Sequence, residues 1–206
     1  MNKLFIIGLP RTGTTSISVA LLEHFKVSHT AYTKRAFELA DVISDCPCFS
    51  DYQQLDVLFP ESKFVYLQRS PEQWLPSIQM LLKKMLPKLN SKAYVNPILK
   101  RSFEQIFDLK IVNDPLEKIH LTRCYQRHEK AVIDYFHGRD NILKIDINQS
   151  DSLQQLLDFL NLQHSGAKQF PHLNIGKLVD NWQDIKHTHK INSNTAGREG
   201  RKFFNY

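Results

Sequence analysis

The beginning of the chain combines an apolar strand, a tight turn and the start of a helix. Residues 4–9 form the predicted strand, and Gly8 and Gly13 bracket the turn at its end. Their spacing is that of the phosphate-binding pattern G-x-x-x-x-G-K-[ST], in which backbone N–H groups of the turn and of the helix start converge on an anion. This feature therefore predicts a strand that leads into an anion-binding turn.

One position departs from the loops that bind nucleoside triphosphates. Thr14 stands where those loops keep the lysine that reaches the β- and γ-phosphates. The cation of this turn is Arg11, three positions earlier. This displacement of the cation makes a nucleoside triphosphate a less expected ligand. Because arginine keeps its proton at neutral pH, we expect Arg11 to act as an electrostatic clamp and not as a proton donor.

The segment Pro10–Thr15 resembles the first loop of the sulfotransferases that use 3′-phosphoadenosine 5′-phosphosulfate (PAPS). That loop reads Pro-[Lys/Arg]-x-Gly-[Thr/Ser]-[Thr/Ser], mostly with lysine in the cytosolic members. The resemblance implies that Arg11 contacts the phosphosulfate and helps the departing phosphate to carry its charge. It also implies that the cofactor's 5′-phosphate is bound by the rest of the loop, which comprises Pro10, Thr12, Gly13, Thr14, Thr15 and Ser16.

A second segment is similar to the other cofactor signature of this family. The apolar strand 63–68 leads to Arg69, and Ser77 follows eight residues later. In the family these two residues hold the 3′-phosphate. Arg69 would lie at the carboxyl end of a strand, where open parallel sheets bind ligands, and Ser77 about two helical turns further on. The alternatives are a surface ion pair for Arg69 and an ordinary helix hydroxyl for Ser77, whose orientation depends on the effect of Pro76.

Strands and helices alternate along the chain. We expect strands over 4–9, 27–32, 63–68 and 141–147, and helices over 14–25, 34–43, 51–58, 71–85, 97–109, 114–137 and 152–160. This rhythm predicts an α/β fold with a central parallel sheet covered on both faces. The resemblance implies a three-layer, P-loop-NTPase-like sulfotransferase fold. A length of 206 residues fits a single domain over 1–206 with an irregular C-terminal end.

The formal net charge of +6 suits a polyanionic small ligand, an acidic acceptor or nucleic acid. The cations are dispersed and no nucleic-acid-reading signature occurs, so we expect no nucleic-acid partner. Cys46, Cys48 and Cys124 lack the spacing of paired metal ligands, which predicts free thiols and no metal requirement. We see neither a signal peptide nor a membrane-spanning segment, and therefore expect a cytoplasmic protein.

The resemblance implies in-line transfer of a sulfuryl group from PAPS to a hydroxyl or amine, with adenosine 3′,5′-bisphosphate (PAP) as product. Such a reaction depends on positioning, on charge stabilisation and on a general base. Asp45, in an Asp-x-Pro segment similar to one of the family, is the first candidate for this base, and His29 and His128 are alternatives. The acceptor, a small molecule, glycan or lipid, stays unidentified. The oligomeric state is also open, a homo-oligomer included.

Two further assignments concern the tail and a tryptophan. Arg198 and Arg201 either close over the nucleotide or belong to an irregular basic end. Trp74 is expected to pack in the core, with stacking on adenine as the alternative.

Two other function classes remain open. In a P-loop kinase or nucleoside triphosphatase, Thr15 would ligate magnesium and Asp146 would be its acidic partner, although the missing loop lysine counts against this class. In a non-catalytic PAP- or nucleotide-binding protein, the bisphosphate pocket would persist without acceptor chemistry.

Overall fold

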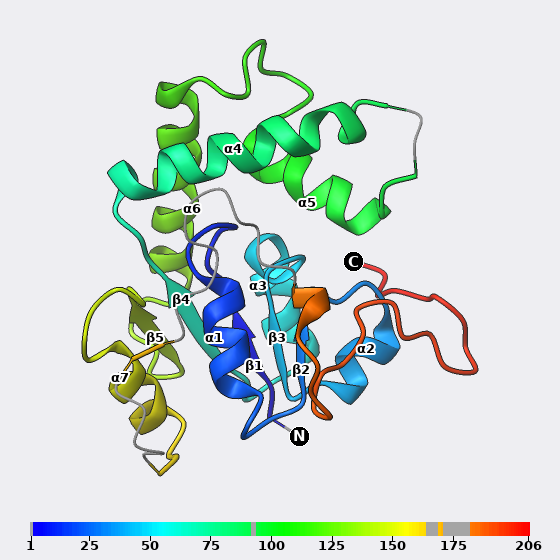
Figure 1. The fold of residues 1–206 in the computed structure, drawn as a ribbon, viewed down its shortest axis with the longest axis vertical. Coiled ribbons are helices and arrows are strands. Elements are labelled where there is room, and N and C mark those ends of the chain that lie inside the picture. The colour runs from blue at the N-terminus through cyan, green and yellow to red at the C-terminus, as the bar shows by residue number, and fades with distance from the viewer. Residues whose placement is uncertain (1, 92–93, 164–168, 171–181) are drawn as a thin grey trace.

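A five-stranded parallel sheet forms the centre of the computed structural model, which describes residues 2–91, 94–163, 169–170 and 182–206 (Figure 1). The strand order is β2-β3-β1-β4-β5. The strands are β1 (Leu4–Ile6), β2 (Val27–His29), β3 (Val42–Ser44), β4 (Lys63–Leu67) and β5 (Ile142–Ile145). Because β1 is the middle strand, the turn that follows it lies at the centre of the sheet's carboxyl edge, where ligands bind in folds of this class.

Helices cover both faces of the sheet. They are α1 (Thr14–Leu21), α2 (Lys34–Leu39), α3 (Cys48–Leu58), α4 (Pro71–Leu89), α5 (Pro97–Phe107), α6 (Lys118–Tyr135) and α7 (Ser152–Phe159), followed by the 3-10 turn η1 (Trp182–Asp184). Helices α1 and α7 pack on one face, and α2, α3 and the end of α6 pack on the other. A third apolar cluster joins α4, α5 and α6, which extend beyond the carboxyl edge (Figure 1). The predicted α/β sandwich is confirmed.

The sequence of β1 explains why both faces are covered. Leu4 and Ile6 belong to the cluster under α1 and α7, whereas Phe5 belongs to the cluster under α2 and α3. Successive side chains of a strand point to opposite faces, so a strand buried on both faces is apolar without interruption. Burial of each such side chain contributes about 1.5–3 kcal/mol to folding.

The prediction for residues 34–43 is wrong in its second half. The helix ends at Leu39, and Val42–Ser44 forms β3, which lies between β2 and β1. All three residues of β3 are buried. A run this short has no readable period, so its place in the sheet follows from pairing with β1 and β2 and not from local pattern. The next helix, predicted from 51, begins earlier, at Cys48.

The long helix after β4 continues through its prolines. Pro76 and Pro87 lie inside α4, which was predicted over 71–85 and extends to Leu89. Pro76 therefore does not end the helix, and Ser77 lies on its buried side. Other boundaries differ by a few residues, as at the helix predicted over 114–137, which covers Lys118–Tyr135.

The three cysteines are buried and form no disulfide. Burial raises the pKa of the Cys46 and Cys48 thiols, and it raises the pKa of Cys124 to about 11. All three are therefore neutral thiols at neutral pH.

Among the described residues, none of the helices has the length and apolar character that a membrane span requires.

Candidate active site

Both glycines of the first turn (residues 8–13) are required by its geometry. A Cβ on Gly8 would lie 2.5 Å from Leu67 Cβ, because the ends of β1 and β4 approach each other closely. Gly13 has a φ of 110°, and a Cβ there would lie 2.2 Å from Ile147 Cδ1. The turn thus depends on residues without side chains at these two points.

The N-terminus of α1 is left open by this turn. Gly13 is the N-cap of α1, no side chain caps the helix, and its first turn contains no acidic residue. Thr12 instead fastens the turn internally, since its Oγ1 donates to the Leu9 carbonyl oxygen at 2.7 Å. The first N–H groups of α1 therefore carry the partial positive charge of a helix start without a capping side chain, which is the usual geometry of an anion site.

The second turn (residues 68–70) contacts the first turn directly. Arg69 Nη1 donates to the carbonyl oxygen of Arg11 at 2.8 Å, across 58 residues of sequence. Arg11 Nε donates to Ser77 Oγ at 2.8 Å. The structure therefore brings together the three side chains selected from the two motifs. It places the Ser77 hydroxyl on Arg11, whereas the sequence paired Ser77 with Arg69.

Two guanidinium groups lie together at this point with few counter-charges. Burial, and then the neighbouring Arg69, lowers the pKa of Arg11, while Asp45 acts in the opposite direction. Burial also lowers the pKa of Arg69, and Asp146 opposes this shift. Arg69 Nε is buried and has no hydrogen-bond partner among the described residues. A bound anion would relieve both the repulsion and the unsatisfied donor.

Two packed aromatic side chains, Trp74 and Tyr125, form a brace that supports the two turns. Trp74 Nε1 donates to the Pro10 carbonyl oxygen at 2.9 Å. The Tyr125 hydroxyl accepts from Arg69 N at 3.1 Å and donates to Arg69 O at 2.9 Å. The rings of Trp74 and Tyr125 lie 4.9 Å apart. Trp74 is thus the core residue that was expected. The role of Tyr125 was missed because its position on α6 carries no signal of a contact with residue 69.

Replacing Tyr125 with phenylalanine tests this brace. The ring still packs on Trp74, but both backbone groups of Arg69 lose their partner, so we expect the free energy of unfolding to fall by about 1–3 kcal/mol. Urea denaturation measures the change. Tyr94→Phe is the control, because Tyr94 is 79% exposed and its replacement should leave stability unchanged. Equal midpoints for the two variants would contradict the brace.

Asp45 and His29 meet beside the start of α1. Asp45 Oδ2 accepts from Thr14 Oγ1 at 3.1 Å, and it lies 3.7 Å from His29 Nε2. His29 Nε2 also lies 3.2 Å from Thr15 Oγ1. The imidazole stacks on Trp182, with ring centroids 5.5 Å apart. The first candidate for the base and one of its alternatives thus form a single cluster at the carboxyl ends of β2 and β3.

His29 is uncharged at neutral pH. Burial lowers the pKa of its imidazole, and the Asp45 carboxylate only partly opposes this shift. A neutral imidazole beside a carboxylate can accept a proton.

His128 does not belong to this cluster. Its side chain is buried, and its Nε2 donates to the Phe49 carbonyl oxygen at 2.8 Å. Burial lowers the pKa of His128 to about 4, so the imidazole is neutral. It packs between Tyr52 and Tyr66 in the core under α6. The described contacts of His128 lie in the core and not in the cluster of Asp45 and His29, so they give its candidate role as a base no support.

The C-terminal tail contacts α2. Arg198 lines a hollow beside α2 with Lys34 and Arg35, and Arg201 is exposed. No described contact joins either arginine to the first or second turn. The tail instead packs on α2, which lies more than 150 residues earlier in the sequence. The described contacts therefore do not support the alternative in which these arginines close over the nucleotide.

One group of side chains has the composition of a metal site. Ligand atoms of Asp108, His120 and Cys124 lie within 4.8 Å of one another. Each already has a protein partner: Asp108 pairs with Arg127 at 2.7 Å, and His120 Nε2 lies 2.9 Å from the Phe107 carbonyl oxygen and 3.4 Å from Cys124 Sγ. These contacts join the end of α5 to α6, and they involve neither the first nor the second turn.

Comparison with known proteins identifies a family. The model of the family described as "Sulfotransferase domain" matches residues 24–179, a range that contains His29, Asp45, Arg69 and Ser77 and begins after the first turn. A search of curated proteins found no match. Among solved structures, this chain is similar to a crystal structure of shikimate kinase from Bacteroides thetaiotaomicron, with a TM-score of 0.40 and 15% sequence identity over 78% of this chain and 99% of the kinase.

Proposed function

This chain belongs to the sulfotransferase domain family, and we propose that it transfers a sulfuryl group from PAPS to a hydroxyl or amine of an acceptor. The observation that carries the proposal is the convergence of Arg11 and Arg69, from two distant turns, at the open N-terminus of α1. A doubly phosphorylated nucleotide supplies the charge that this arrangement lacks.

The two turns divide the nucleotide between them in this proposal. The N–H groups at the start of α1, with Thr14, Thr15 and Ser16, bind the 5′-phosphate, and Arg11 lies over the phosphosulfate. Arg69 binds the 3′-phosphate through its guanidinium, whose Nε has no partner among the described residues, and Ser77 orients Arg11. The protein needs no covalent intermediate, because positioning and fixed charge account for most of the catalysis in group transfers of this kind.

The chemical step is an in-line displacement at sulfur. The acceptor oxygen or nitrogen forms a bond to sulfur as the bond between sulfur and the bridging phosphate oxygen breaks. PAP leaves with the bonding electron pair, and Arg11 stabilises the charge that develops on the bridging oxygen. The acceptor proton passes to the cluster of Asp45 and His29, in which the two groups lie 3.7 Å apart. We expect this cluster to contribute about 10²–10⁴ in rate.

The kinase alternative is less well supported by the contacts. Its magnesium ligand would be Thr15, whose hydroxyl oxygen lies within hydrogen-bond distance of His29 Nε2, at 3.2 Å. Its acidic partner would be Asp146, whose Oδ1 accepts from both Asn148 N and Asn148 Nδ2.

A screen of acceptors with labelled PAPS tests the function, and calorimetry of PAP, ADP and ATP tests the nucleotide. We expect label on a hydroxyl or amine acceptor and tight PAP binding without metal. A preference for ATP with magnesium would defeat the proposal. Tight PAP binding without turnover on any acceptor would instead assign a non-catalytic nucleotide-binding protein.

The pH dependence of kcat/KM tests the proton acceptor. Burial lowers the pKa of His29, so we expect the acid limb of activity, along which His29 becomes protonated, to have its midpoint below the ordinary histidine pKa of about 6.5. Asp45→Asn removes the charge that raises the pKa of His29. The acid limb should therefore move to lower pH, while the plateau falls. An acid limb that persists unchanged in His29→Gln would show that the titrating group lies elsewhere.

A further inference from the structure

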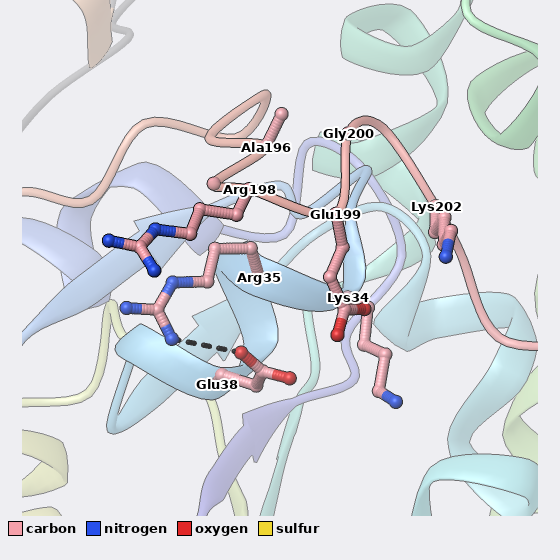
Figure 2. A pocket seen from close by; sticks show the side chains of 9 residues that line it. Lys34, Arg35, Glu38, Ala196, Arg198, Glu199, Gly200 and Lys202 are labelled. Atoms are coloured by element: carbon pink, nitrogen blue, oxygen red, sulfur yellow. Dashed lines mark hydrogen bonds and ion pairs between the residues drawn. The ribbon is translucent and has the colours of Figure 1, made fainter.

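A hollow of about 360 Å³ lies between α2 and the turn of residues 196–202 (Figure 2). Its charged lining consists of Lys34, Arg35, Glu38, Arg198, Glu199 and Lys202. This hollow is distinct from the two phosphate turns, whose residues are absent from its lining.

Positive charge exceeds negative charge in the hollow. Arg35 Nη1 pairs with Glu38 Oε2 at 3.0 Å, which neutralises one of the four cations. In the described part of the chain, Lys34, Arg198 and Lys202 have no ion-pair partner, and Glu199 is the other carboxylate of the lining. In the view of Figure 2, the guanidinium groups of Arg35 and Arg198 lie toward the same end of the hollow. The excess of positive charge in the lining favours the binding of an anion.

The turn that carries Arg198 is held in place at both ends. Thr33 Oγ1 donates to the Thr195 carbonyl oxygen, and Lys34 N donates to the Lys202 carbonyl oxygen at 2.8 Å. Gly197 has a φ of 63°, and a Cβ there would lie 3.3 Å from Arg35 Cγ, so the backbone of the turn rests on the Arg35 stem. The cations are thus presented by an anchored turn, which reduces the entropy lost when a ligand binds.

The end of the tail strengthens this anchor. Phe203 and Phe204 pack against Phe37 of α2, with ring centroids 5.9 and 5.3 Å apart, and the Tyr206 hydroxyl donates to the buried carboxylate of Asp51.

The hollow is also close to the candidate active site along the chain. His29, in the proton-accepting cluster, and Lys34, in the hollow, are separated by five residues, and therefore by at most about 17 Å of extended chain. An acceptor of a few sugar units or residues can span this distance. The lining offers one small apolar side chain, Ala196, and no aromatic or branched aliphatic group. It therefore suits anionic substituents on a polar chain better than a peptide or a lipid, which bind through apolar contacts.

We propose that this hollow binds a sulfate or carboxylate group of an acidic oligosaccharide, at a position remote from the hydroxyl that is sulfated. That the oligosaccharide is the acceptor of the reaction rests on the proposed function. The binding of the anion itself does not depend on PAPS. Guanidinium groups recognise such oxyanions through paired N–H donors. Arg198 brings one such group to the hollow, and among the described residues it has no ion-pair partner.

Calorimetry with a sulfated oligosaccharide, with inorganic sulfate and with an acidic peptide of matched charge tests the proposal. We expect the oligosaccharide to bind the wild-type protein more tightly than either alternative. The variant Arg198→Ala/Lys202→Ala should weaken this binding about tenfold or more, equivalent to about 1.4 kcal/mol, and leave PAP affinity unchanged. The control is Lys83→Ala/Lys84→Ala, which removes the same charge from exposed positions of α4 and should change affinity less than twofold.

Several outcomes would overturn the hollow as an oligosaccharide site. The first three are no binding of the oligosaccharide, equal losses of affinity in the two double variants, and tighter binding of the peptide than of the oligosaccharide. The fourth is a loss of PAP affinity in the Arg198→Ala/Lys202→Ala protein, which would indicate that these cations bind the nucleotide. The wild-type protein could also bind the oligosaccharide through Arg198 but fail to bind PAP. That result would count against the proposed transfer reaction and would still support the hollow as an anion site.

Discussion

Replacing Arg11 with alanine should lower kcat for sulfuryl transfer by about 10²–10³, the usual loss when a preorganised group that stabilises transition-state charge is removed. Arg11 combines a left-handed backbone, with a φ of 73°, and a side chain fixed by Ser77. Its guanidinium is therefore held in place before the substrate binds. Because the charge on the bridging oxygen grows as the bond to sulfur breaks, the loss should appear in kcat more than in KM. Steady-state assays with labelled PAPS measure both.

Two variants separate this effect from a loss of net charge. Arg11→Lys keeps a cation that the resembling loops also use, so it should restore much of the rate. Arg123→Ala removes a cation from an exposed position of α6 and should leave kcat unchanged. If Arg11→Ala retained wild-type kcat, or if Arg123→Ala caused an equal loss, Arg11 would not be the residue that stabilises the leaving group.

The geometry of the two turns proposed to bind the phosphates could be predicted because its signal is local. The bracketing glycines and the strand before Arg69 define strand ends, and the carboxyl ends of parallel strands share one edge. The contact of Arg69 with Arg11 follows from this rule although the residues are 58 positions apart. The partner of Ser77 could not be predicted in the same way. It depends on how α4 continues through Pro76, which is set by packing in the third cluster and not by helix propensity.

The sequence offered Asp45 and His29 only as separate candidates for the proposed proton acceptor. Asp45 follows β3 and His29 is the last residue of β2, and β3 itself was missing from the prediction. Without β3, the sequence gives no reason to place the two side chains 3.7 Å apart. The tail shows the same limit, because Thr33 and Phe37 hold it through contacts that span most of the chain. Nonlocal contacts of this kind leave no period in the sequence.

Replacing Arg69 with alanine should weaken PAP binding by about 10- to 100-fold, the range expected when charge-assisted hydrogen bonds to a phosphate are lost. The comparison with adenosine 5′-monophosphate makes the test specific, because that nucleotide lacks the 3′-phosphate. The wild-type protein should prefer PAP, and Arg69→Ala should lose this preference while its affinity for the monophosphate changes little. Calorimetry without metal measures all four affinities.

A further variant distinguishes phosphate binding from support of the first turn. Arg69 Nη1 also holds the Arg11 carbonyl oxygen, so its removal could act through the shape of that turn. Tyr125→Phe loosens the Arg69 backbone but leaves the guanidinium present, and it should therefore preserve most of the preference for PAP. If Arg69→Ala weakened both nucleotides equally, the residue would act by shaping the first turn. The 3′-phosphate would then require another partner, and the division of the nucleotide between the two turns would be wrong.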